Sequence, residues 1–139
     1  MKELNLKKKV KRMDELYIPG DLVFHYIPKT TIKKYVKVYV CSTNNVLSLE
    51  DMDGNLYDYI GVLYPIPLTP DILEKNGWKL SHGFYWSPNE EGAGIGLSSE
   101  TGYVWDAYLG RQPLRSNINS VSDLQHLLFG IGLNSEMEV

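Results

Sequence analysis

The sequence predicts an α+β protein made mostly of short antiparallel strands. Short apolar segments, some alternating with polar residues, recur between Gly, Pro and Asn positions, which is typical of strands joined by tight turns. Two other segments carry helix-start signals. We expect a small SH3-like β-barrel lobe, followed by a helix, a three-stranded antiparallel meander and a C-terminal helix. The predicted divisions are a basic N-terminal arm over residues 1–16, the barrel lobe over 17–66 and the helix-meander-helix lobe over 67–139.

Five strands are predicted in the first lobe, over residues 22–27, 35–41, 46–49, 56–60 and 62–66. The second strand alternates, which places three valines on one face: Val36, Val38 and Val40. We expect these valines to be buried and Lys37 to be exposed, because a shift of the strand register by one residue would point the apolar side chains toward the solvent. Asp53-Gly54 predicts a hairpin turn, since both residues readily take positive φ angles. Closing such a sheet into a barrel would limit its exposed edges.

A short helix opens the second lobe. Thr69 stands at its N-cap, Pro70 at the first helical position and Gly77 at the stop. Short connections after this helix predict an antiparallel meander. Its three strands are expected over residues 78–86, 94–97 and 102–109.

The last part of the chain is expected to begin with a polar loop over residues 111–119. A helix follows, predicted from apolar residues at helical spacing: Val121, Leu124, Leu127, Leu128 and Ile131. Ser120, with Asp123 three residues later, marks the start of this helix. Residues 135–139 are expected to form an acidic tail.

Charge is distributed unevenly along the chain. Residues 1–37 hold 10 Lys or Arg and 4 Asp or Glu, whereas residues 38–139 hold 4 and 13, so a basic segment precedes an acidic body. The arm contains one basic cluster: Lys7, Lys8, Lys9, Lys11 and Arg12. Such a cluster can neutralise phosphates, keep a terminus in solution, or fold back on the acidic body or a second copy of it.

No catalytic motif, metal-ligand spacing or cofactor fingerprint is recognisable, so we expect no catalytic residues, no metal and no cofactor. The three histidines, His25, His82 and His126, fall on separate predicted elements. Cys41 is the only cysteine, which rules out a disulfide within the chain and indicates a reducing compartment. No apolar run reaches about 18 residues, so no membrane-spanning helix is expected.

Two segments carry a resemblance to a known family. Residues 66–78 read Ile-Pro-Leu-Thr-Pro-Asp-Ile-Leu-Glu-Lys-Asn-Gly-Trp, and residues 121–129 read Val-Ser-Asp-Leu-Gln-His-Leu-Leu-Phe. With the strand opening Gly-Asp-Leu-Val at residues 20–23, they resemble a family of small proteins from prophages and mobile elements of Bacteroides-type gut bacteria. The resemblance covers most of the chain from Gly20 onward. It implies a mobile-element context and a bacterial cytoplasm, and it brings no catalytic residues.

Aromatic residues are frequent, with ten Tyr, three Trp and three Phe. They either fill the core of a small protein or form an exposed surface for a partner. The leading hypothesis is a non-catalytic accessory protein of a phage or mobile element that binds a macromolecule, most simply a protein. Alternation in the last meander strand places Tyr103 and Trp105 on one face. The candidates for the binding surface are Tyr35, Tyr39, Tyr57, Tyr59, Tyr103 and Trp105.

Two other functions stay open at this point. The alternative partner is a nucleic acid, held by the basic arm together with Tyr35 and Tyr39 of the second strand. The basic candidates for that role are Lys7, Lys8, Lys9, Lys11, Arg12 and Lys37. The third hypothesis is an enzyme whose site no motif marks.

Overall fold

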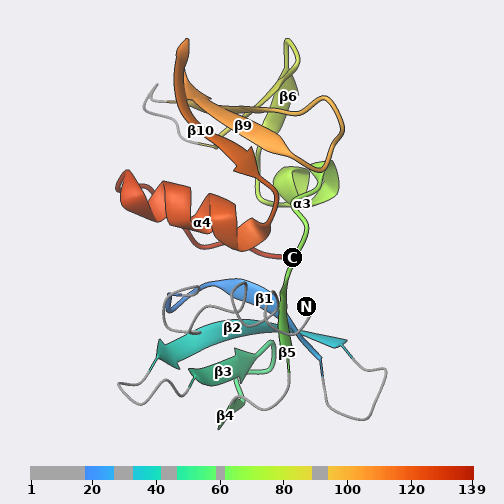
Figure 1. The fold of residues 1–139 in the computed structure, drawn as a ribbon, viewed down its shortest axis with the longest axis vertical. Coiled ribbons are helices and arrows are strands. Elements are labelled where there is room, and N and C mark those ends of the chain that lie inside the picture. The colour runs from blue at the N-terminus through green and yellow to red at the C-terminus, as the bar shows by residue number, and fades with distance from the viewer. Residues whose placement is uncertain (1–17, 27–32, 42–46, 59–61, 89–93) are drawn as a thin grey trace, which may run out of the picture. The chain divides into compact units, whose positions relative to one another are not determined.

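The computed structural model describes residues 18–26, 33–41, 47–58, 62–88 and 94–139. The chain divides into two compact units, Met1–Tyr64 and Pro65–Val139. Each unit is built around a five-stranded sheet, and both helices among the described residues belong to the second unit (Figure 1). The α+β class is therefore confirmed. The predicted N-terminal arm lies outside the described residues.

The first sheet has the strand order β4-β3-β2-β1-β5. Its strands are β1 (Leu22–Tyr26), β2 (Lys33–Cys41), β3 (Leu47–Asp51), β4 (Leu56–Asp58) and β5 (Val62–Pro65). The four strands from β1 to β4 pair antiparallel in sequence order. No pairing between described residues joins β4 to β5, so no closed barrel is found. The SH3-like barrel therefore stays a prediction.

Burial in β2 follows the predicted alternation where side chains are described. Val36 and Val38 are fully buried, whereas the side chain of Val40 is outside the described part of the structure. Lys37, expected to be exposed, is half-buried. The buried apolar residues of this unit are Leu22, Val23, Val36, Val38, Leu49 and Leu63.

The turn between β3 and β4 is the predicted hairpin. Gly54 has a φ of 86°, a conformation that glycine adopts without strain. The Asp51 carboxylate accepts hydrogen bonds from the backbone N–H groups of Asp53 (3.0 Å) and Asn55 (2.9 Å). The side chain of Asp51 therefore satisfies the backbone donors of the turn.

The second sheet is an antiparallel meander with the order β10-β9-β8-β7-β6. Its strands are β6 (Lys79–Ser81), β7 (Phe84–Trp86), β8 (Ile95–Ser98), β9 (Trp105–Leu109) and β10 (Gln112–Ile118). The helices of the unit are α3 (Pro70–Lys75) and α4 (Val121–Gly130). Both lie on the same side of this sheet (Figure 1). Leu73 of α3 and Leu124 of α4 are fully buried, so this side carries the core.

The prediction of a three-stranded meander is wrong, because the sheet has five strands. His82 (φ 53°) and Gly83 (φ 82°) form a two-residue turn that divides the single strand expected over residues 78–86 into β6 and β7. The polar loop expected over residues 111–119 contains β10. This strand lies at the sheet edge and is exposed up to its last residue, so it lacks the alternation that identifies a strand.

Both helix starts were predicted correctly. The Thr69 hydroxyl caps α3 by accepting from the N–H of Ile72 (3.4 Å), and Pro70 is the first helical residue. The Ser120 hydroxyl caps α4 by accepting from the N–H of Asp123 (3.1 Å). Capping satisfies backbone donors that have no partner within the helix.

The C-terminal residues are tied to α3. The side-chain amide of Asn76 pairs reciprocally with the backbone of Glu138: its Nδ2 donates to the Glu138 carbonyl and its Oδ1 accepts from the Glu138 N–H, both at 2.8 Å. Lys75 Nζ donates to the Val139 carbonyl at 2.7 Å, and Met137 is buried. The residues predicted as an acidic tail therefore pack on the body of the second unit.

Candidate functional site

The register of the second sheet separates its side chains onto two faces. Tyr85, Leu97 and Ala107 are cross-strand neighbours on β7, β8 and β9, and all three are buried. Their face carries the helices. Because side chains alternate along a strand, the residues between them point to the opposite side, which we call the outer face. Among the described elements of the second unit, none lies over this face (Figure 1).

Three aromatic side chains gather on the outer face: Phe84, Trp86 and Tyr108. We call them the aromatic cluster. The Phe84 and Trp86 ring centroids are 5.6 Å apart, and Phe84 meets Tyr108 edge-on at 5.8 Å. All three residues are half-buried, so part of each remains open to solvent. Such ring geometries are favourable beyond the apolar area that they bury.

Trp86 lies over β8, where the facing residue is glycine. A Cβ atom placed on Gly96 would lie 3.0 Å from Cζ3 of the Trp86 ring and 3.3 Å from Cδ1 of Phe84. The indole Nε1–H donates to the carbonyl of Ser81 at 3.1 Å. Because Gly96 has no side chain, the two rings can approach the backbone of β8 closely.

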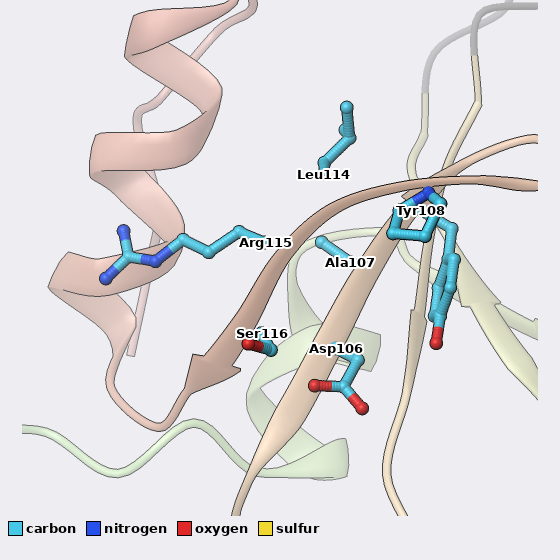
Figure 2. A pocket seen from close by; sticks show the side chains of 7 residues that line it. Asp106, Ala107, Tyr108, Leu114, Arg115 and Ser116 are labelled. Atoms are coloured by element: carbon cyan, nitrogen blue, oxygen red, sulfur yellow. The ribbon is translucent and has the colours of Figure 1, made fainter.

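A pocket of about 330 Å³ adjoins the aromatic cluster, where β9 pairs with β10 (Figure 2). The pairing of these strands shifts register between Pro113 and Arg115, and again between Arg115 and Ile118. Such bulges bend an edge strand and hinder pairing with another chain. The residues that line the pocket are Asp106, Ala107, Tyr108, Pro113, Leu114, Arg115 and Ser116. Tyr108 thus belongs to both the pocket and the aromatic cluster.

Asp106 gives the pocket a negative charge. Its side chain is half-buried, and no described residue offers its carboxylate a hydrogen bond or an ion pair. The cationic residue of the lining, Arg115, has its guanidinium 3.4 Å from the Asp123 carboxylate. Figure 2 shows the Arg115 side chain running toward α4, away from Asp106. Arg115 therefore does not neutralise Asp106.

The titration of one tyrosine is perturbed on the inner side of the sheet. Burial raises the pKa of Tyr85 above its ordinary value of 10.0, and the nearby Glu74 carboxylate raises it further. Burial and the Glu74 carboxylate both favour the neutral form of the Tyr85 phenol. This perturbation belongs to the core and not to the outer face.

Trp105 is not a surface residue, contrary to the prediction. Its side chain is 3% exposed, its Nε1–H donates to the Leu68 carbonyl at 2.9 Å, and its ring meets Tyr85 edge-on. Tyr103 is 69% exposed because it precedes β9, which begins at Trp105. Strand alternation therefore does not reach Tyr103, and the two residues do not share a face.

The other predicted site residues belong to the first unit. Tyr35 is exposed and stacks on Phe24 of β1, with ring centroids 4.7 Å apart. Tyr39 and Tyr57 lie in β2 and β4, but their side chains are outside the described part of the structure. Tyr59 and the five arm residues lie wholly outside it; the arm residues are Lys7, Lys8, Lys9, Lys11 and Arg12. The binding roles of these residues stay predictions.

The three histidines lie on separate elements. His25 is buried in β1, His82 occupies the turn between β6 and β7, and His126 is half-buried in α4. The ring Nδ1 of His82 is 2.9 Å from the Ser81 hydroxyl. None of the three lines the pocket at β9 and β10.

Sequence reasoning missed the aromatic cluster and Asp106. A signal was present: Phe84 and Trp86 alternate around Tyr85, and glycines stand at position 94, just before β8, and at position 96 within it. Cross-strand pairing of an aromatic residue with glycine protects the glycine backbone from water. Finding this pair required knowing which strands are neighbours.

Among the described residues, no helix has the length and apolarity to cross a membrane. Within the same residues, no three His, Cys, Asp or Glu side chains gather as metal ligands would. Comparison of the chain with protein-family models, with curated proteins and with solved structures finds no match. A function is therefore proposed from the chemistry of the outer face.

Proposed function

We propose that this chain is a non-catalytic protein that binds a macromolecule, most simply a protein, through the outer face of its second sheet. The observation that supports this proposal is the half-exposed aromatic cluster beside a pocket of about 330 Å³. Tyr and Trp are enriched where proteins bind one another, because their rings supply large contact areas with little loss of conformational freedom. A pocket beside them can accept a side chain of the partner.

The polar groups of this region suit recognition. Asp106 and Ser116 line the pocket, and Ser98 is the cross-strand neighbour of Asp106. A carboxylate and two hydroxyls can fix the orientation of a partner by hydrogen bonds. Catalysis would need a nucleophile with an adjacent base, and no hydrogen bond between described residues joins the Ser116 hydroxyl of the lining to the Asp106 carboxylate.

The test removes one ring of the cluster. Tyr108→Ala should lower the capture of partner proteins from a bacterial lysate at least tenfold. Aromatic anchors contribute most of the binding free energy of an interface, and truncating one removes its contribution. Phe129→Ala is the matched control: Phe129 is 65% exposed at the end of α4, outside the cluster. Both variants should keep the circular dichroism spectrum of the parent. Equal capture by the parent and Tyr108→Ala would contradict the proposal.

Two finer expectations belong to the same proposal. The phage or mobile-element context rests on the family resemblance of the sequence. An SH3-like barrel in the first unit would add a second binding module, and the strand order β4-β3-β2-β1-β5 is compatible with it.

Nucleic-acid binding by the basic arm is the alternative function. Deleting residues 1–12 should abolish that binding, and unchanged DNA and RNA affinity after the deletion would remove the arm from consideration.

A further inference from the structure

We infer that the outer face binds an arginine side chain of the partner. The guanidinium would lie beside the Asp106 carboxylate and against the rings of Phe84 and Tyr108. This inference rests on the proposed function and adds to it the chemistry of the partner.

The strand register places these three side chains in neighbouring positions on the outer face. Ser98 pairs with Asp106 across β8 and β9, and because Tyr85 pairs with Leu97, Phe84 is the neighbour of Ser98 on β7. Adjacent strands are about 4.8 Å apart, so the backbones of Phe84 and Asp106 lie about 10 Å apart with Ser98 between them. The Phe84 ring itself lies over Gly96 and against Tyr108. Tyr108 lies two residues after Asp106 on the same face of β9. The Asp106 carboxylate belongs to the row of Ser98, and the Phe84 and Tyr108 rings meet in the neighbouring row of Gly96, so carboxylate and rings are neighbours on the outer face.

The charge of this region favours a cation. The Asp106 carboxylate has no ion-pair partner among the described residues, and the Arg115 guanidinium is held by Asp123 on α4. Lys79 also belongs to the outer face, opposite Trp86 on β6. Since β6 is three strands from β9, it lies about 14 Å from Asp106. The acidic surplus of residues 38–139 attracts a basic partner over a longer range.

Arginine fits this arrangement better than lysine. The planar guanidinium can stack on aromatic rings while its N–H groups donate in parallel to a carboxylate. The ammonium group of lysine is compact and strongly hydrated, so it gains less from the rings. Ser116, in the pocket lining, offers a further acceptor. The groups present therefore match both the charge and the shape of an arginine side chain.

The test compares peptides that differ in charge but not in shape. An acetylated octapeptide with four Gly-Arg repeats and its citrulline counterpart are titrated into the full chain by calorimetry. The arginine peptide should bind at least tenfold more tightly than the citrulline peptide. Asp106→Asn should lower the affinity for the arginine peptide about tenfold and leave the citrulline peptide unaffected, because a hydrogen bond to a charged group contributes more than a neutral one.

Glu100→Gln is the matched control, because it removes an exposed carboxylate from the loop between β8 and β9, outside the pocket lining. This substitution should change the affinity for the arginine peptide less than twofold. Equal binding of the arginine and citrulline peptides, or equal loss in Asp106→Asn and Glu100→Gln, would overturn the inference. If Tyr108→Ala weakened both peptides equally while Asp106→Asn weakened neither, the outer face would still bind a partner, but without recognising its charge. The melting temperature of Asp106→Asn should equal or exceed that of the parent, because the substitution removes a partly buried charge.

Discussion

Replacing Gly96 by alanine tests whether the aromatic cluster lies on β8 as described. The added Cβ would stand 3.0 Å from Cζ3 and 3.2 Å from Cη2 of Trp86, and 3.3 Å from Cδ1 of Phe84. These distances are shorter than ordinary carbon–carbon contacts of about 3.5–4.0 Å. Both rings would have to move by several tenths of an ångström. The movement would also strain the hydrogen bond from Trp86 to the Ser81 carbonyl.

The expected cost is a difference between two terms. Overpacking a well-packed site costs about 1–3 kcal/mol. Alanine reduces the conformational entropy of the unfolded chain relative to glycine, which returns about 0.4–1 kcal/mol where the native φ suits it, and Gly96 does not have a positive φ. The free energy of unfolding should therefore fall by about 1 kcal/mol. For a unit of this size the melting temperature should fall by about 4–8 °C.

Gly94→Ala is the internal control, because Gly94 immediately precedes β8 and also lies near the Trp86 ring. A Cβ on Gly94 would lie 3.4 Å from Cε3 of Trp86, close to ordinary contact, so this variant should be as stable as the parent or slightly more stable. Thermal and urea unfolding of both variants, followed by tryptophan fluorescence, measure the difference. If Gly96→Ala were as stable as Gly94→Ala, the rings would not lie over Gly96. The description of the outer face would then be wrong.

Two further predictions concern the core and the C-terminal residues. Asn76→Ala removes both hydrogen bonds to the Glu138 backbone and should cost about 1–3 kcal/mol of unfolding free energy; hydrogen exchange at the Glu138 amide should speed up, and unchanged exchange would refute the pairing. Tyr85 has a folded pKa above its unfolded value of 10.0, so its neutral form stabilises the fold below that pH, and this contribution is lost as the pH rises through the raised pKa. Tyr85→Phe, which cannot ionise, should show a shallower alkaline loss of stability; identical pH profiles would argue against the assignment.

The helix boundaries were predictable because local residues determine them. Thr69, Pro70 and Ser120 act within one turn of their own helix, so their roles are visible in a short window of sequence. The buried valines of β2 were predictable for a similar reason. Val36 and Val38 alternate with polar residues, and only one register buries them both.

The strand count and the position of Trp105 depended on information that a short window does not hold. The turn at His82-Gly83 needs a positive φ at histidine, which is uncommon for residues other than glycine. The edge strand β10 is polar because water covers it, so its sequence resembles a loop. Trp105 is buried because β9 begins there, and extending the alternation back to Tyr103 gave the wrong face.

The covering of Gly96 explains the positions of only some side chains on the outer face. Trp86 and Phe84 cover Gly96, and the indole N–H already has its acceptor in Ser81, so these two rings would be placed as they are without any ligand. Asp106 is different. Partial burial of a carboxylate costs free energy unless hydrogen bonds or an opposite charge compensate for it, and no described residue supplies either. A bound cation would supply both. The binding role therefore depends most on Asp106, and its replacement by asparagine separates recognition of a partner from support of the sheet.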